Sequence, residues 1–564
     1  FGVRGVQVLL DSLPLPMPDG QAILDIVDPA FVQRAELVRG PASLFWGNGS
    51  GGVLFLSTHA PTARGVRARL MGGSYGLRQI AAQASGQAGR HRFHGYVSNT
   101  AQEGYRAHSD GRFTRGALHG TFDLGPLTSL SVTAAAALQD AENPGQLTRE
   151  QIADNPRAAD PRTLPTQAGK ESQQAQFGAT LLRQTGIGVL SATAHGLVRD
   201  LDNPLTFAYV KLYRQAGGLR LTFQNETARL AWGVGADVGT MHDDRDRWSN
   251  AEGEPGDERL EDQQETVTST SAFAYVAPQW GALRLRLGAR ADRIAFTLDD
   301  ELQLEGIDAS GDRTFSAISP AVGLSYELPS ALFFASYSTA FSTPTTTELT
   351  GDGRPGFDPE LQPERTRGFE IGARGVVPDV RLQFDVALFY LRIRDRLVPF
   401  QTEEGGDQVF YRPSGESDHR GLELAASWRF APEMTLGLTY TAGRFVFEDD
   451  ELEGNRIPGV PDQRLYAQLQ AQRRGLWGRV GVEAVSAYFT DDANEAENDG
   501  YALLDVQLGH EGVRLGAARF LPFLKVSNLL DTRYNGSVIV NAFGGRYFEP
   551  APGRTVQAGL NVQL

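Results

Sequence analysis

The chain has 564 residues, no cysteine, 64 glycines, 41% hydrophobic residues and 21% charged residues. The absence of cysteine excludes disulfide frameworks, thiolate zinc sites and cysteine catalysis. No run of about 18 apolar residues occurs, which excludes helical membrane spans. The net charge of −15 argues against a nucleic-acid partner, because such proteins need a basic face. The composition is that of a chain that folds.

The first 60 residues are typical of a small α+β unit. Alternating apolar residues predict a strand at 6–11, followed by a proline-rich turn and a short segment at 22–31. A second strand is expected at 35–38, and a glycine-rich run at 47–52 leads into a third strand at 53–57. The run lacks the Gly-Lys-Ser/Thr sequence of a phosphate-binding loop, so we expect its glycines to serve backbone geometry.

From residue 64 to the C-terminus, apolar and polar residues alternate with period two. Residues 283–292, 382–390, 502–508 and 556–564 are clear examples. This alternation predicts strands with one apolar face and one polar face. A water-soluble β-sandwich and a membrane barrel can both produce it.

The connections between these strands favour a barrel. Tight turns such as 124–126 and 328–330 alternate with long polar stretches, several of them acidic. These stretches are expected to be loops at 140–175, 242–266, 298–313, 400–420, 446–463 and 489–500. Room remains for about 22 strands of roughly 10 to 11 residues. The sequence therefore predicts an all-β transmembrane barrel of about 22 antiparallel strands, preceded by the small α+β unit.

A family becomes visible in residues 31–58. This segment resembles the signature near the end of the plug domain of TonB-dependent outer-membrane receptors of the ferric-siderophore type. The matching positions are the Arg-x-Glu pair, the Arg-Gly-Pro turn, the Trp-Gly step and the Gly-Gly pair: Arg34, Glu36, Arg39, Gly40, Pro41, Trp46, Gly47, Gly51 and Gly52. Further blocks look like barrel landmarks of the same family, in the same order, at 341–349, 358–375, 419–428, 454–464 and 526–562.

The resemblance implies a domain organisation and a location. Residues 1–60 are expected to be the C-terminal part of the plug domain, and residues 61–564 the transmembrane β-barrel in the outer membrane of a Gram-negative cell. The plug is expected to be N-terminally truncated, with the TonB-binding box before Phe1. The implied partners are the TonB–ExbB–ExbD complex, a ferric siderophore or similar chelate, and outer-membrane lipid.

The implied function is active uptake of a ferric-siderophore complex, with no enzyme activity and no resident cofactor, since iron travels in the substrate. Haem receptors of the family carry a histidine between two boxes that match 341–344 and 358–361 here, and this chain has none there. Cobalamin, another metal chelate or an oligosaccharide remain alternative cargoes. A passive porin or a surface-adhesion barrel is the alternative from another class, and a soluble all-β protein is a third.

The resemblance also implies a charge lock between plug and barrel. Arg39 matches a plug arginine that pairs with two barrel glutamates, which correspond to Glu370 and Glu423. The alternative is that both glutamates are ordinary inward-facing polar residues. The second plug arginine of this lock is expected upstream of Phe1, and Arg4 is not assigned to it. Arg34, Glu36, Gly40, Pro41, Gly47, Gly51 and Gly52 are expected to be structural residues of the plug.

The ligand-facing apex of the plug is expected at 16–21. Pro16, Asp19 and Gln21 are the candidate ligand-binding residues, although a Pro/Asp/Gly turn also serves folding alone. No metal site is predicted. The nine histidines are scattered, and the acidic stretches at 243–265 and 491–494 fit a solvated surface better than a calcium loop.

Overall fold

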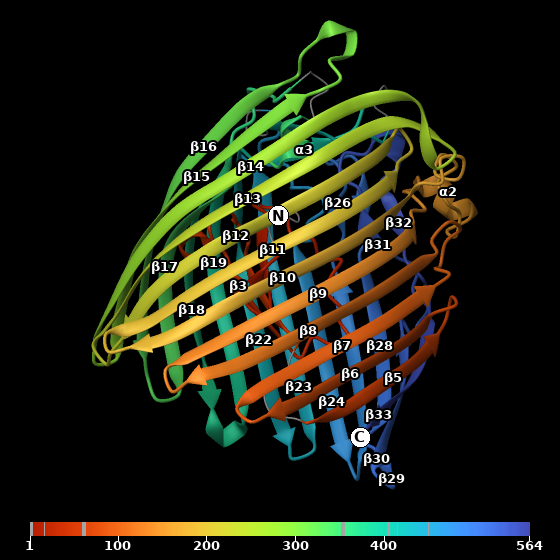
Figure 1. The fold of residues 1–564 in the computed structure, drawn as a ribbon. Coiled ribbons are helices and arrows are strands. Elements are labelled where there is room, and N and C mark those ends of the chain that lie inside the picture. Colours follow the sequence, from red (N-terminus) through yellow and green to blue (C-terminus); the bar gives the residue numbers. More distant parts are fainter. Residues whose placement is uncertain are drawn as a thin grey trace.

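The computed structural model describes residues 4–15, 17–58, 64–350, 356–402, 407–413, 415–448 and 451–564. These residues form a closed β-barrel with a small mixed sheet in its lumen (Figure 1). No helix in this part of the chain is both long and apolar enough to cross a membrane.

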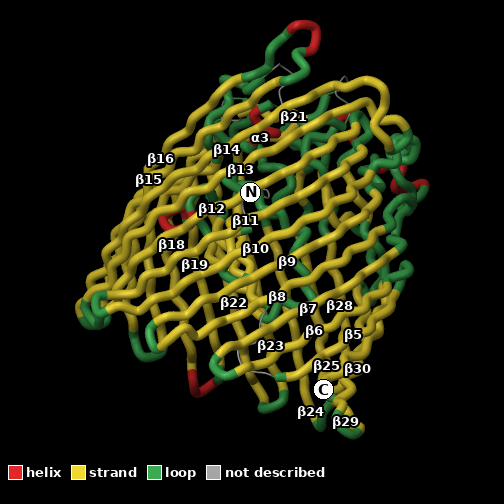
Figure 2. The backbone as a smooth tube through the Cα atoms, viewed as in Figure 1, coloured by secondary structure: helices red, strands yellow, loops and turns green. Residues whose placement is uncertain are grey.

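The described residues give a barrel wall of 22 antiparallel strand positions, because β28 and β29 both pair with β30 and share one position. The ring closes where β33 pairs with β5, with Leu560 opposite Leu70. Figure 2 shows the strands running obliquely around the barrel, with loops at its two ends. The predicted all-β barrel is therefore confirmed. The wall strands are β5 (Gly65–Gly73), β6 (Arg78–Ala88), β7 (His91–Gln102), β8 (Gly111–Gly125), β9 (Thr128–Glu142), β10 (Gly169–Thr185), β11 (Gly188–Pro204), β12 (Tyr209–Glu226), β13 (Leu230–Ala251), β14 (Glu254–Trp280), β15 (Leu283–Asp300), β16 (Gly311–Glu327), β17 (Ala331–Ser342), β18 (Glu364–Val377), β19 (Leu382–Arg394), β22 (Glu416–Ala431), β23 (Met434–Phe447), β24 (Gln463–Arg473), β25 (Leu476–Val485), β28 (Tyr501–His510), β29 (Val513–Leu515), β30 (Ala518–Ser527) and β33 (Thr555–Gln563).

The longest strands correct one prediction. β13 has 22 residues and β14 has 27, and their hairpin runs through 242–266, which was expected to be a loop. Ion pairs cross this hairpin: Arg247 lies opposite Glu261 and 3.3 Å from its carboxylate, and Arg245 Nε reaches diagonally to Glu265 Oε1 at 2.8 Å. Such cross-strand pairs stabilise a ladder, so the charged residues extend the strands instead of forming a solvated loop.

The two ends of the barrel differ in their connections. At the short-turn end, strands are joined by a few residues, such as 186–187 between β10 and β11. At the long-loop end, the connections include 143–168 and 343–363. The connections at the two ends contain α2 (Arg149–Asp154), η1 (Leu304–Gly306), α3 (Thr346–Leu349), η2 (Pro378–Val380), β20 (Leu397–Phe400), β21 (Phe410–Pro413), β26 (Tyr488–Phe489), β27 (Glu497–Asn498), β31 (Asn535–Val538), η3 (Phe543–Gly545) and β32 (Phe548–Pro550).

The alternating pattern places one face of each strand in the lumen and the other outside. On β18, Glu364, Thr366 and Gly368 are buried toward the lumen. Phe369 and Ile371 point outward and are 58% and 60% exposed. Large apolar side chains on the outer face suit contact with lipid hydrocarbon, where they cost nothing to expose.

The described residues 4–58 form what we call the inner domain, a four-stranded sheet in the order β2-β1-β4-β3. Its elements are β1 (Val6–Leu10), β2 (Leu13–Pro14), β3 (Arg34–Arg39), α1 (Ser43–Trp46) and β4 (Gly52–Ser57). β1 runs parallel to β4, while β3 is antiparallel to it. Val8, Leu10, Leu15, Ile26 and Leu56 form its small core. The expected domain boundary near residue 60 falls between β4 and β5, and residues 59–63 lie outside the described residues.

An apolar cluster fills the lumen between the inner domain and the long-loop end. Met17 of the inner domain packs with wall residues Phe296 and Phe315 and with Leu349 and Leu361 of the 343–363 loop. All five are less than 10% exposed. The described parts of the 343–363 loop, residues 343–350 and 356–363, therefore fold into the barrel and cover the inner domain.

Candidate functional site at the interface between the inner domain and the barrel

Arg39 lies at the end of β3 and reaches the wall. One Nη atom forms an ion pair with Glu423 on β22, and the other lies 3.3 Å from Asp385 Oδ1 on β19. Glu370 lies within electrostatic range of Arg39, but no hydrogen bond or ion pair joins the two among the described residues. The structure thus brings together two of the three predicted lock residues and adds Asp385, which sequence reasoning missed. The role of this contact as a lock remains a prediction.

Arg4 makes a second and more buried connection near the long-loop end. Its Nε lies 2.9 Å from Glu348 Oε1 on α3, and its Nη2 lies 3.0 Å from Glu364 Oε1 at the start of β18. The three side chains are only 7–11% exposed. Burial opposes the charge on Arg4, but the carboxylates of Glu364 and Glu348 outweigh it and raise the pKa of the guanidinium. Sequence reasoning did not assign Arg4 to the lock; the available signal was an arginine two residues before the apolar strand 6–10.

The local structure around Glu348 and Glu364 holds the two carboxylates in place. Thr345 and Glu348 form a capping box at the start of α3, so the Glu348 carboxylate also accepts the Thr345 backbone N–H at 2.8 Å. Glu364 Oε1 accepts the Leu397 N–H at 2.9 Å. Arg4 therefore joins the inner domain to the 343–363 loop and to β18 at once.

A third charged group holds α1 against the wall. Arg220 donates a hydrogen bond to the Phe45 carbonyl at 2.7 Å, and its guanidinium lies 4.4 Å from the centroid of the Trp46 ring. Arg290 lies so close to Gly47 that a Cβ there would be 2.9 Å from its Nη2. Gly47 also has a φ of +70°, so both its conformation and its surroundings favour glycine.

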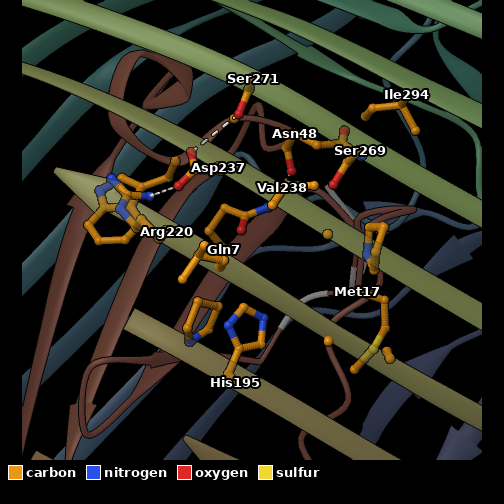
Figure 3. A pocket seen from close by; sticks show the side chains of 18 of the residues that line it. Gln7, Met17, Asn48, His195, Arg220, Asp237, Val238, Ser269, Ser271 and Ile294 are labelled. Atoms are coloured by element: carbon orange, nitrogen blue, oxygen red, sulfur yellow. Dashed lines mark hydrogen bonds and ion pairs between the residues drawn. The ribbon is translucent and has the colours of Figure 1, made fainter. Parts of the chain in front are cut away.

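A cavity of about 130 Å³ lies between this part of the inner domain and the wall strands β10 to β15 (Figure 3). Arg290 Nη1 lies 2.7 Å from Asp237 Oδ2, and Arg290 Nε lies 2.8 Å from Asp292 Oδ1. His195 Nδ1 and Asp292 Oδ2 are buried at the cavity without a hydrogen-bond partner in the described residues. A polar cavity of this volume is roomy enough for a few water molecules, each of which takes about 30 Å³.

The predicted ligand-facing apex is covered. Pro16 lies outside the described residues. Asp19 is fully buried; its Oδ1 accepts the Gln21 N–H at 3.1 Å, and its carbonyl accepts a hydrogen bond from Thr343 Oγ1 at 3.4 Å. Burial raises the pKa of the Asp19 carboxyl to about 6. Gln21 Oε1 accepts a hydrogen bond from Arg214 at 3.2 Å. In this state both residues contact the wall and a loop, and their contact with a ligand remains a prediction.

The long loops are joined across the mouth of the barrel. Asp407, in the β20–β21 connection, lies 2.8 Å from Arg162 of the β9–β10 loop. It also accepts a hydrogen bond from Thr206 of the β11–β12 loop at 2.7 Å. Strands β19 and β22 are far from β9 to β12 around the ring, so this connection crosses the opening. A ligand that enters from this end would have to displace these loops or bind to them.

The expected structural residues occupy positions that suit that role. Gly40, Gly47 and Gly52 have φ values of +74°, +70° and +131°. A Cβ on Gly52 would collide with the Val38 carbonyl, and the Gly51 N–H donates to the Gly5 carbonyl at 2.7 Å.

The remaining predicted positions lie at the domain edge and in the loops. Pro41 packs toward Gly368 of β18, while Arg34 and Glu36 form an exposed pair at 2.7 Å. In the 491–494 turn, the Asp491 carboxylate accepts two backbone N–H groups. Within the described ranges, no three His, Asp or Glu side chains converge as a metal site.

Comparison with known proteins decides the family. The model of the TonB dependent receptor-like beta-barrel matches residues 59–529. The chain belongs to this family. TonB-dependent receptors of this barrel type are proteins of the Gram-negative outer membrane, so the long-loop end faces the medium and the short turns face the periplasm.

Individual relatives are more distant. The ferrioxamine B receptor of Salmonella typhimurium is 27% identical over 276 residues, which cover 48% of this chain and 37% of that protein. The pesticin receptor of Yersinia enterocolitica is 29% identical over 207 residues, covering 36% of this chain and 29% of that receptor. The matches thus span about a third of these relatives' length. The unliganded ferric citrate transporter FecA superimposes with a TM-score of 0.83 at 16% identity, covering 100% of this chain and 88% of FecA, which shows a shared fold.

Proposed function

We propose that this TonB-dependent receptor imports a metal chelate, most specifically a ferric siderophore, across the outer membrane. The observation that carries the proposal is a barrel whose lumen is filled by an inner domain held through ion pairs. Arg39 and Arg4 both bridge the inner domain to the wall. Ion pairs between a domain and its surrounding wall can be exchanged for water when the domain is pulled, whereas a continuous apolar interface would resist.

The energy for such a movement must come from outside the chain. We infer that the TonB–ExbB–ExbD complex supplies it by pulling the inner domain, which then acts as the plug. The cargo class rests on the names of the relatives, among them a ferrioxamine B receptor and a ferric citrate transporter. Cobalamin and oligosaccharides stay as alternative cargoes that the binding experiment separates.

The decisive experiment combines binding and uptake. Tryptophan fluorescence of the detergent-solubilised full-length protein is titrated with a ferric hydroxamate, a ferric catecholate, ferric citrate, haem and cobalamin. Uptake of the bound chelate, labelled with radioactive iron, is then measured in cells with and without TonB. Saturable binding of one iron chelate and TonB-dependent uptake support the proposal. No binding of any iron chelate, or uptake that is independent of TonB, contradicts it.

Ion conductance distinguishes the proposed receptor from a passive porin. The inner domain and the described parts of the 343–363 loop occupy the lumen, so a planar bilayer containing the protein should show almost no conductance. A stable open-channel current from the intact protein would favour the porin alternative.

A further inference from the structure

Side chains from three different connections surround the Asp407 carboxylate at the mouth of the barrel. They come from the 143–168 loop, the 205–208 connection and the 528–554 loop, which lie far apart in the sequence. We call this group the cradle, and its members are Gln146, Arg162, Thr206 and Arg546. All four can donate hydrogen bonds, so the cradle has the chemistry of an anion site.

Asp407 occupies the cradle as an internal anion. Its Oδ1 lies 2.8 Å from Arg162 Nη1, and its Oδ2 accepts a hydrogen bond from Thr206 Oγ1 at 2.7 Å. A longer hydrogen bond of 3.4 Å comes from Gln146 Nε2. The Asp407 side chain is only 15% exposed, so the cradle encloses the carboxylate on most sides.

Arg546 is the member of the cradle that Asp407 does not satisfy. Its Nη2 lies 3.7 Å from Asp407 Oδ1, which is beyond hydrogen-bond distance. Its Nε is buried and has no hydrogen-bond partner within the described residues. A buried donor without an acceptor is costly, and the cost is larger when the group is charged. A ligand with two carboxylates could bind Arg162 and Arg546 at the same time, because guanidinium groups match carboxylates in geometry.

The positions of the two arginines do not depend on Asp407. The 143–168 and 528–554 loops are joined by reciprocal backbone hydrogen bonds between Leu147 and Phe548, at 2.8 and 3.1 Å. Figure 1 shows α2 and β32, which belong to these loops, on the same side of the mouth. Arg162 is held by Asp160, which accepts a hydrogen bond from Arg162 Nε at 3.0 Å. The cradle would therefore keep its shape if another anion replaced Asp407.

Asp407 lies at the end of a small hairpin that can move. β20 and β21 have four residues each and form a two-stranded sheet separate from the barrel wall. Such an isolated pair of strands is only marginally stable by itself. Leu397 and Val398 anchor the base of the hairpin in apolar clusters and are 5% and 2% exposed. The far end is held through Asp407, so exchange of this one carboxylate would release it.

The charges of the cradle favour an anionic ligand. Arg162 and Arg546 face the carboxylates of Asp160 and Asp407, so the group as a whole is neutral in this structure. Removal of Asp407 from the cradle leaves a net charge of +1. This charge attracts an anion and gives no advantage to a neutral or cationic chelate.

We propose that the cradle binds the free carboxylates of a polycarboxylate metal chelate, which replaces Asp407 and releases the end of the β20–β21 hairpin. This inference rests on the proposed function and narrows its cargo to one chemical class. Asp407 then has two roles. It holds the mouth closed, and it competes with the cargo for Arg162.

The test measures binding to the detergent-solubilised full-length protein by isothermal titration calorimetry. The probes are ferric citrate, metal-free citrate and a ferric trihydroxamate that has no carboxylate. The variants are Asp407→Asn, which removes the internal anion, and Arg546→Gln, which removes the unsatisfied cation. The matched control is Asp499→Asn, which removes a carboxylate that is 83% exposed in another loop at the same end. Heat-modifiable gel mobility verifies that each barrel is folded.

We expect opposite effects from the two variants on ferric citrate. Asp407→Asn should bind about tenfold more tightly than wild type, and Arg546→Gln about tenfold more weakly, because a hydrogen bond to a charged group contributes at least about that factor. Asp499→Asn should bind as wild type does, and the trihydroxamate should not distinguish the four proteins. Hydrogen exchange of β21 should accelerate in Asp407→Asn and in wild type saturated with ferric citrate.

The proposal is overturned if Asp407→Asn does not bind ferric citrate more tightly, if Arg546→Gln binds it as wild type does, or if exchange in β21 does not change. Equal affinity for metal-free citrate also overturns it, since the site would then serve a free carboxylate. If the trihydroxamate binds and ferric citrate does not, this inference fails while the proposed import of a metal chelate stands. If no iron chelate binds any of the four proteins, the proposed function fails as well.

Discussion

Removing the Arg4 side chain tests how strongly the inner domain is held. In Arg4→Ala, the carboxylates of Glu348 and Glu364 lose their cation while remaining 11% and 7% exposed. Breaking a buried ion pair by deleting one partner costs about 3 to 5 kcal/mol. Both carboxylates keep a backbone N–H donor, from Thr345 and from Leu397, so we expect the low end, about 3 kcal/mol.

The expected signal is local. Hydrogen exchange in the peptides that contain β1 and α3 should accelerate about 100-fold, because 1.4 kcal/mol corresponds to a tenfold change in an opening equilibrium. Amides in wall strands far from Arg4, such as those of β24 and β25, should not change. Arg4→Lys keeps the charge but loses the second hydrogen-bonding arm of the guanidinium. Its exchange rates in β1 and α3 should therefore lie between those of wild type and those of Arg4→Ala.

The control variant is Arg34→Ala, which removes an ion pair whose side chains are 70% and 54% exposed. Exposed pairs contribute at most about 1 kcal/mol, so exchange in β1 and α3 should stay at the wild-type rate. The reasoning is refuted if Arg4→Ala exchanges at the wild-type rate in both peptides, since the buried pair would then contribute nothing to holding the domain.

Three further predictions concern the same interface. Arg39→Ala should lower the free energy that holds the inner domain by roughly 1 to 2 kcal/mol, less than Arg4→Ala, because the side chains of Arg39 and Glu423 are 33% and 24% exposed. Hydrogen exchange of β3 measures this loss, and an effect larger than that of Arg4→Ala would contradict the prediction. Asp19 has a folded pKa of about 6, above its unfolded value, so ionising its carboxyl costs stability as pH rises from about 4 to 6. Asp19→Asn should therefore raise the melting temperature at pH 8 and leave it unchanged at pH 4. An equal shift at both pH values would contradict this reasoning. Gly52→Ala forces a Cβ into the Val38 carbonyl at a φ of +131°; limited proteolysis should then cut the inner domain while the barrel keeps its heat-modifiable mobility, and an uncut inner domain would argue against the strain.

The barrel could be predicted from sequence because its cause is local. Period-two alternation at residues such as 382–390 indicates that one face of the strand meets lipid and the other the lumen. The pattern can be recognised within each strand, without knowing its neighbours. The hairpin at 242–266 was wrongly predicted to be a loop because the local composition of a segment does not report its contacts with the neighbouring strand. Acidic composition predicts a loop, while the pairing of Arg245 with Glu265 depends on which strand lies opposite.

The interface between the inner domain and the wall shows more clearly what could not be predicted from the sequence. A family resemblance pointed to Arg39, Glu370 and Glu423, but the partner Asp385 and the whole Arg4 group were missed. Arg4 meets Glu348 and Glu364 across separations of 344 and 360 residues, and no periodicity encodes such a meeting.

The sequence by itself determined that this chain forms a large antiparallel barrel with a glycine-rich α+β unit at its start, because side-chain alternation is local to each strand and short turns join consecutive strands as antiparallel neighbours. Tertiary structure alone decided which charges meet, that the described parts of the 343–363 loop fold inward, and that Arg162, Thr206 and Arg546 surround Asp407. Electrostatic energy depends on distances through space, and only the closed ring sets those distances.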